Sequence, residues 1–338
     1  MSSPQTTMPP NASPPDPAEL LKQQQYKLRV KNIAEMVKQK KCVLFLGSAI
    51  HVPSPNPKYD YPPTKCPPIG NQLSELLATK CSYPDQDRWN LQRVASYYEW
   101  LSGFRSQLVT EVRNAIHMEA GSDNGGATAP VAEREPSPVL RGLARLGFPI
   151  VITTNYDHLY EKALAQIQKE ASTGETSKPP AGGVFEKSIY SPKSTVRTRD
   201  CPAVPSSTSP YLLKIHGDFD EDDSIVITDE DYIQFVLRMG DKHPFHPVGK
   251  NTLTYLTKWP TLFIGYRLND YNLRLLIKTL RWRMDQAQIP ASYSVDLKPD
   301  VLIRAAMEKQ QYVSFIEKNL WDFVPDLYRE VTGQEMPQ

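Results

Sequence analysis

The sequence predicts an α/β fold in which a doubly wound, mostly parallel sheet is covered by helices on both faces. Several runs of four or five apolar residues lack the polar alternation of half-exposed strands, as in VLFL from Val43 and TLFI from Thr261. Strands that are buried on both faces show this continuous apolar pattern. Helix-like segments lie between the runs, which favours crossover connections and hence a parallel sheet. With 338 residues, the chain is long enough for one large domain or two modest ones.

The first part of the chain is predicted to lead from a disordered segment into the first strand. Residues 1–17 are rich in Pro, Ser and Thr, and have too little apolar surface to offset the entropy of ordering. An amphipathic helix is expected from about Pro17 to Lys40, followed by a strand at Cys42–Leu46. The seven prolines of His51–Pro68 indicate an irregular loop, after which Asn71–Thr79 has a helical pattern.

A helical insertion is predicted at about residues 71–147, between the first and second strands. Two helix-like stretches between Pro84 and Met118 are rich in aromatic residues, a pattern more typical of a core or a subunit contact than of a cofactor site. The glycine-rich run Glu119–Pro138 is expected to be a flexible connection.

The second half of the chain alternates strands and helices around one long loop. From about residue 171 to residue 210, the chain is dominated by Ser, Thr, Pro, Lys and Gly, with a short strand-like run near 184–189. This composition predicts a flexible loop beside the pocket. The other expected elements are, in order, strand Pro149–Thr153, helix Asp157–Lys169, strands Leu212–Ile215 and Ser224–Ile227, helices Thr228–Met239 and Asn251–Lys258, strand Thr261–Gly265, helix Asp270–Met284, a final strand Ala291–Val295, and a helical tail at Ser314–Thr332.

Composition excludes several classes of function. A formal net charge of +1 gives no electrostatic argument for binding nucleic acid or a membrane surface. No apolar segment approaches the roughly 20 residues of a membrane-spanning helix, and the N-terminus lacks the pattern of a secretion signal, so a cytoplasmic protein is expected. The four cysteines are scattered without a CxxC spacing, so neither a structural zinc nor another metal site is expected.

Four of the predicted strands end in polar or glycine-containing segments. Open parallel sheets bind ligands outside the carboxyl ends of their strands, so these segments are expected to form a single nucleotide pocket. Each also fits a structural role on its own, as a turn, a helix cap or a core histidine. His51 likewise fits either the pocket or an ordinary loop. The segments contain Gly47, Ser48 and Ala49; Asn155 and Asp157; His216; and Gly265, Asn269 and Asp270.

The order of these segments resembles that of the sirtuin-like (silent information regulator two-like) domain. The resemblance rests on GSA from Gly47, TTNYD from Thr153, KIHGD from Lys214 and GYRLND from Gly265, and it is strongest to the bacterial branch that degrades NAD in antiphage defence. It covers about Cys42–Val295 and implies a catalytic domain over residues 18–338 with a Rossmann-like sheet. It further implies that Asn155 and His216 are catalytic, and that Gly47, Ser48, Ala49, Asp157, Gly265, Asn269 and Asp270 bind NAD.

The glycine motif departs from the family pattern. Members typically have GAG, whereas this chain has Gly47, Ser48 and Ala49. A second glycine lets the backbone approach phosphates closely, and alanine adds one methyl group, so weakened or re-angled binding is expected. The backbone N–H groups of these three residues are expected to hold the pyrophosphate.

The implied chemistry assigns distinct roles to the polar side chains. A neutral His216 is suited to accept a proton from a ribose hydroxyl or from the attacking water, since the ordinary pKa of histidine lies near working pH. Asn155 would hold the ribose or the water by hydrogen bonds. Asp157 would fix its loop or cap the following helix.

The resemblance implies an NAD glycohydrolase that produces nicotinamide and ADP-ribose as the effector of an abortive-infection system. One alternative is an NAD-dependent protein deacylase, although the chain lacks the paired CxxC elements and the PDFR-type segment of deacylases. Another is a partner-dependent nucleotide-binding or nuclease subunit of a defence complex. The resemblance also implies a homo-oligomer and a separate partner, either a HerA-like ATPase or, with less support, a short Argonaute. Contact with nucleic acid is expected only through such a complex, and contact with a membrane is not expected.

Overall fold

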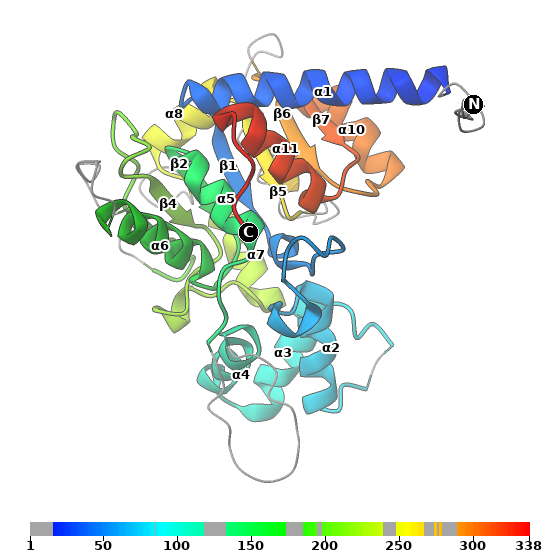
Figure 1. Ribbon diagram of the computed structural model, residues 1–338. Helices are drawn as coiled ribbons and strands as arrows, with labels where there is room; N and C mark the ends of the chain where they lie inside the picture. Colours follow the sequence, from blue (N-terminus) through cyan, green and yellow to red (C-terminus); the bar gives the residue numbers. More distant parts are fainter. Residues whose placement is uncertain are drawn as a thin grey trace, which may run out of the picture.

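The computed structural model describes residues 16–84, 86–117, 133–173, 185–194, 198–238, 248–266, 274–275, 277–278 and 289–338. Within these residues, seven strands form one sheet in the order β3-β4-β2-β1-β5-β6-β7, and every neighbouring pair is parallel (Figure 1). The predicted α/β class with a doubly wound sheet is confirmed. The strands are β1 Val43–Leu46, β2 Ile150–Thr153, β3 Glu186–Ile189, β4 Tyr211–Lys214, β5 Thr261–Ile264, β6 Ser292–Val295 and β7 Val313–Ile316.

The sheet changes direction of winding at its central strand. Val43 of β1 lies opposite Ile150 of β2 on one side and opposite Thr261 of β5 on the other. The chain therefore builds the β2 side first and later returns to place β5 against the free edge of β1. Such a switch point opens a crevice outside the carboxyl ends of the strands, where ligands bind in open α/β sheets.

Helices cover both faces of the sheet, because successive strand residues point to opposite sides. Leu44 and Leu46 pack with α1, α5, α6 and α11, whereas Val43 and Phe45 pack with α7, α8 and α10. Figure 1 shows α1 lying along α11 at the end of the molecule opposite the three helices α2 (Gly70–Lys80), α3 (Leu91–Ser102) and α4 (Arg105–His117). These helices span α1 Pro17–Lys38, α5 Pro138–Leu146, α6 Leu159–Thr173, α7 Asp229–Arg238, α8 Lys250–Lys258, α10 Val301–Gln311 and α11 Leu320–Thr332.

A separate helical layer lies beyond the carboxyl ends of the strands (Figure 1). It consists of α2 Gly70–Lys80, α3 Leu91–Ser102 and α4 Arg105–His117, and its own core reaches Tyr156 after β2 and Ile227 after β4. The helix α5, which the sequence prediction counted in the insertion, instead packs on the sheet with α6 and α11. The insertion therefore ends before α5.

Two sequence predictions about the later elements were wrong. Residues 225–227 are not a strand: they follow the short 3-10 helix η3 (Asp222–Ser224), and the N–H of Val226 bonds to the His216 carbonyl. The helical tail predicted from Ser314 begins instead with β7, which pairs with β6, so the strand at Ala291–Val295 is not the last one.

Several predicted segments fall partly outside the described residues. Residues 1–15 lie outside them, and helix α1 begins at Pro17 behind the Asp16 cap. In the predicted flexible loop, the described part contains β3, and Asp200 accepts hydrogen bonds from the N–H groups of Asn251 and Thr252 in α8. No helix of the described part is long and apolar enough to cross a membrane.

Candidate functional site

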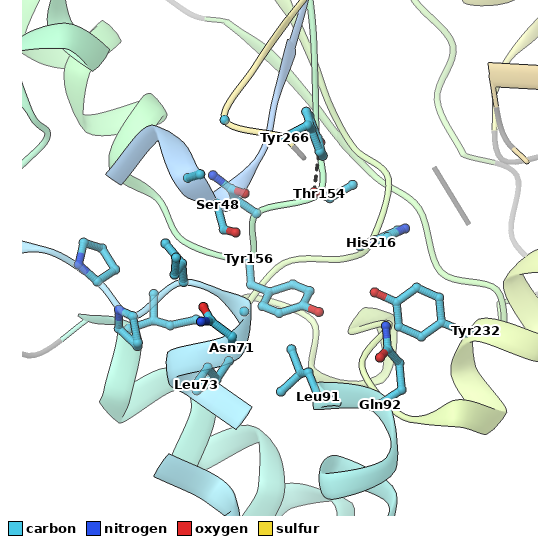
Figure 2. A pocket seen from close by; sticks show the side chains of 18 of the residues that line it. Ser48, Asn71, Leu73, Leu91, Gln92, Thr154, Tyr156, His216, Tyr232 and Tyr266 are labelled. Atoms are coloured by element: carbon cyan, nitrogen blue, oxygen red, sulfur yellow. Dashed lines mark hydrogen bonds between the residues drawn. The ribbon is translucent and has the colours of Figure 1, made fainter. Parts of the chain in front are cut away.

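A cavity of about 1050 Å³ lies between the carboxyl ends of the central strands and the helical layer. Small-molecule sites typically have volumes of roughly 300–1,000 Å³, so this cavity is large enough for a dinucleotide. Figure 2 shows Ser48, Thr154 and His216 on the sheet side of the cavity, and Leu91 and Gln92 of α3 facing them.

Most of the residues predicted for the pocket line this cavity. The segments after β1, β2, β4 and β5 all reach it, as their position in the sheet led us to expect. Gly47 lies directly behind the lining, and Asn269 and Asp270 are outside the described residues. The predicted residues in the lining are Ser48, Ala49, Asn155, Asp157, His216 and Gly265.

The predicted phosphate cradle is largely occupied by the protein itself. The N–H of Gly47 donates to the Ile264 carbonyl, and the N–H of Ala49 donates to the Gly265 carbonyl. These two N–H groups are not available to a pyrophosphate in this structure, contrary to the prediction. The N–H of Ser48 has no such bond within the described residues.

Tyr266 closes the glycine turn from the β5 side. Its hydroxyl donates to the Leu46 carbonyl at 2.6 Å, and the Thr154 hydroxyl oxygen lies 2.9 Å from the Tyr266 hydroxyl oxygen (Figure 2). A Cβ on Gly47 would lie 2.7 Å from the Tyr266 ring. Gly47 is therefore required for the approach of the β5 loop, a different reason from the phosphate contact that the sequence suggested.

Asn155, Asp157 and His51 form a polar cluster at the cavity wall, in which His51 and Asp157 are buried and Asn155 is half-buried. The Nε2 atom of His51 lies 3.2 Å from Asp157 Oδ2 and 3.3 Å from Asn155 Nδ2. The other carboxylate oxygen of Asp157 accepts from the N–H of Leu159 at 2.9 Å and so caps α6. His51, left open between pocket and loop by the sequence, belongs to the pocket.

The charge of Asp157 is set by its surroundings. Burial alone would raise the pKa of this carboxyl, but the contact with His51, the positive charge of Lys214 and the Leu159 N–H together hold the pKa well below its ordinary value. Asp157 is therefore a fixed negative charge beside the amide of Asn155.

A fully buried lysine supports this segment from behind. Lys214, the last residue of β4, donates to the carbonyls of Tyr156 and Asp157 and forms an ion pair with Asp218 at 2.7 Å. Buried charges are stable only when they are paired and hydrogen-bonded, so these contacts fix the course of the chain around Asn155. In the sequence, the signal for this residue is a lysine at the end of an otherwise apolar strand.

His216 lines the same cavity in an aromatic setting. The residue is 5 % exposed, and its ring makes edge contacts with Tyr232 and Phe235 at centroid distances of 5.4 and 5.0 Å, respectively. Both aromatic residues belong to α7, so this helix packs against the imidazole. Figure 2 shows the side chains of His216 and Tyr232 on the same side of the cavity.

The outer part of the cavity is apolar and exposed. Trp89, Ile233 and Leu237 line it although 69 %, 53 % and 62 % of their surfaces are accessible. Large apolar side chains on a cavity rim provide contact area for a ligand without fixing its orientation.

One group of side chains has the composition of a metal site. Ligand atoms of His158, Asp218 and Asp220 lie within 4.8 Å of one another. The same carboxylates already bind two lysines, since Lys214 pairs with Asp218 and Lys187 pairs with Asp220 at 2.5 Å. The positive charges of the two lysines neutralise the negative charges of Asp218 and Asp220 at the place where a metal cation would otherwise bind.

The comparison with protein families places the fold and the site in one family. The family described as "SIR2-like domain" matches residues 149–321, which carry Asn155, Asp157, His216 and Gly265. The chain belongs to the SIR2-like family.

Curated relatives of this SIR2-like chain include two proteins named NAD(+) hydrolase ThsA. The one from Enterococcus faecium is 28% identical over 221 residues, which are 64% of this chain and 38% of the relative. The one from Acinetobacter baumannii (strain 532279) is 30% identical over 155 residues, or 46% of this chain and 27% of the relative. Defense-associated sirtuin 2 of Bacillus subtilis is 30% identical over 135 residues, or 39% of this chain and 10% of the relative. The chain thus spans between 10% and 38% of the length of these relatives.

Two contributors to the SIR2-like site have weak signals in the sequence. Tyr266 directly follows Gly265, but nothing in the sequence shows that its hydroxyl reaches Leu46 on another strand. Trp89 belongs to the insertion, where the density of aromatic residues favoured a core role. Both depend on contacts between distant segments, which only the folded chain defines.

Proposed function

We propose that this chain is an NAD glycohydrolase that cleaves the bond between nicotinamide and ribose. The observation that carries the proposal is that Asn155 and His216, which follow different strands, line one cavity at the switch point of a SIR2-like sheet. The names of the two ThsA relatives support the same activity.

The proposed reaction consumes one water molecule and releases one proton. The bond between the pyridinium nitrogen and C1′ breaks, its electron pair stays on nicotinamide, and the ribose gains oxocarbenium character. Water then attacks C1′ and gives ADP-ribose. His216 accepts the proton from the attacking water or from a ribose hydroxyl, and Asn155 orients that group by hydrogen bonds.

The charge of Asp157 in the cavity wall favours the oxocarbenium-like transition state of the proposed reaction. The positive charge of the substrate moves from the pyridinium ring to the ribose as the bond breaks. The anionic Asp157 next to Asn155 stabilises positive charge at this end of the cavity without having to rearrange during the reaction.

Product analysis tests the proposal. Purified protein incubated with NAD should release nicotinamide and ADP-ribose in equal amounts. The same incubation with an acetylated peptide should leave the peptide acetylated; peptide-dependent release of nicotinamide would instead identify a deacylase.

The biological setting is a further part of the proposal. Defense-associated sirtuin 2 and the resemblance of the motifs support a role in antiphage defence, and the resemblance supports a homo-oligomer that acts with a HerA-like ATPase. The mass of the protein in solution tests the oligomer. A nicotinamide release that rises when a HerA-like ATPase from the same genome is added tests the partner, and an unchanged rate argues against it.

A further inference from the structure

His51 connects the loops after β1 and β2, which form the part of the cavity wall that contains Asn155 and Asp157. It ends the 3-10 helix η1 (Ser48–His51) after β1, and its ring reaches the segment after β2. Only 3 % of the residue is exposed, yet it lines the cavity together with Asn155 and Asp157.

The contact with Asp157 determines which ring nitrogen of His51 carries a proton. An ionised carboxylate only accepts hydrogen bonds, so the Nε2 atom 3.2 Å from Asp157 Oδ2 must be the donor. Asp157 cannot turn away to another partner easily, because its Oδ1 atom caps α6 through Leu159. Asp157, held at the start of α6, thus fixes the direction of the His51 Nε2–H group.

The proton on Nε2 of His51 restricts the orientation of the Asn155 carboxamide. The Nδ2 group of Asn155 lies 3.3 Å from the same Nε2 atom, and two donors cannot bond to each other. A rotation of the carboxamide by 180° exchanges its nitrogen and oxygen, and then places Oδ1 beside the Nε2–H group. The rotation also gives a partner to Oδ1, which otherwise is buried without a hydrogen bond among the described residues.

We propose that His51 is a positioning residue for the hydrolysis of NAD, holding the Asn155 carboxamide in the cavity wall with its oxygen on Nε2–H. This hydrogen bond keeps the carboxamide, which the proposed function uses to orient the ribose or the water, in one rotational position. The inference rests on the proposed function for its catalytic meaning, whereas the hydrogen bonds on which it depends exist in the free protein.

Three variants separate positioning from other roles. His51→Gln carries a side-chain N–H₂ group at about the reach of Nε2, and should keep kcat within about fivefold of the parent. His51→Leu has a similar size but no donor, and should lower kcat by about 10–100-fold with little change in KM, as is typical when a supporting hydrogen bond is lost. If the leucine variant does not fold, His51→Asn, which is too short to reach Asp157, should show the same loss of kcat. Circular dichroism and the melting temperature establish folding.

Several outcomes would overturn the inference. A glutamine variant as impaired as the leucine variant would mean that the imidazole itself transfers a proton. A leucine variant with the parent's kcat, or one in which only KM rises, would also contradict positioning. In an Asn155→Ala background, His51→Leu should cause no further loss, and a full additional loss would count against it.

A measurement without turnover separates this inference from the proposed function. In protein with ¹⁵N-labelled histidine, long-range ¹H–¹⁵N spectra should show the proton of His51 on Nε2, with the signal identified by its loss in His51→Gln. An unprotonated Nε2 would overturn the inference even in an active protein. Conversely, a parent chain that releases no nicotinamide while His51 carries its Nε2 proton would overturn the function and leave the hydrogen-bond arrangement standing.

Discussion

Gly47 and Gly265 lie against each other at the carboxyl ends of β1 and β5. A Cβ on Gly47 would lie 2.5 Å from the Gly265 carbonyl oxygen, and a Cβ on Gly265 would lie 2.4 Å from the Gly47 carbonyl oxygen. Gly265 also has a φ of +80°, which disfavours any side chain. This mutual approach sets the position of Ser48 and Tyr266 on the two loops, and therefore the shape of one end of the cavity.

The first prediction concerns this approach. Gly47→Ala and Gly265→Ala should each lower the free energy of unfolding by about 1–3 kcal/mol through overpacking, and Gly265→Ala should lose more because of its positive φ. Urea unfolding measures both. Gly70→Ala is the matched control, since its Cβ would meet nothing within 4 Å. A control that loses as much stability as Gly47→Ala would show that the close approach is unimportant.

The arrangement of the pocket was predictable because it follows from strand order. Short apolar runs identified the central strands, and polar residues at their ends had to meet at one edge of a parallel sheet. That reasoning brought Asn155 and His216 together, although 60 residues separate them in the chain. It could not show that the N–H groups of Gly47 and Ala49 bond to the β5 segment, because that depends on the distance between two loops.

The end of the sheet was not predictable for local reasons. Helix α10 ends at Gln311 and is capped by Tyr312, a non-glycine residue with a φ of +52°, so no glycine marks the start of β7. The exposed Val301 and Leu302 also blur the amphipathic pattern of that helix. Residues 225–227 were predicted to be a strand because they are apolar. In the structure, Ile225 and Ile227 pack in the core of the helical layer, and Val226 packs against the sheet.

The second prediction concerns the buried lysine. Lys214→Met removes the partner of a fully buried carboxylate and should destabilise the protein by about 3–5 kcal/mol. Because Lys214 also holds the carbonyls of Tyr156 and Asp157, nicotinamide release should decrease in whatever protein remains folded. Lys187→Met, which removes a partly exposed partner of Asp218, should cost only about 0–1 kcal/mol. Equal losses in the two variants would contradict the role given to Lys214.

The third prediction concerns pH. Burial would raise the pKa of Asp218, but hydrogen bonds from His158 and Lys214 and the Lys214 charge lower it far below its ordinary value. A lowered folded-state pKa stabilises the protein above the unfolded-state pKa near 4, and this contribution is lost as the pH falls further. The stability gap between the parent and Asp218→Asn should therefore be larger at about pH 6 than at about pH 3 in urea unfolding. A gap that widens on acidification would show the opposite shift.

The fourth prediction concerns the cavity rim. Trp89→Ala should raise KM for NAD while kcat changes little, because an apolar rim binds the ground state and the transition state alike. Trp100→Ala is the control, since Trp100 is similarly exposed in the same helical layer but lines a different, smaller cavity. Steady-state kinetics with both variants decide the point, and an equal rise in KM for both would argue against a rim contact.

The most direct test is the rate of nicotinamide release from NAD by the parent, Asn155→Ala and His216→Ala, each checked for folding. Each substitution should reduce kcat by about 100-fold or more, because it removes the orienting amide or the proton acceptor. A parent that hydrolyses NAD while both variants retain its rate would contradict the assignment of this cavity as the catalytic site.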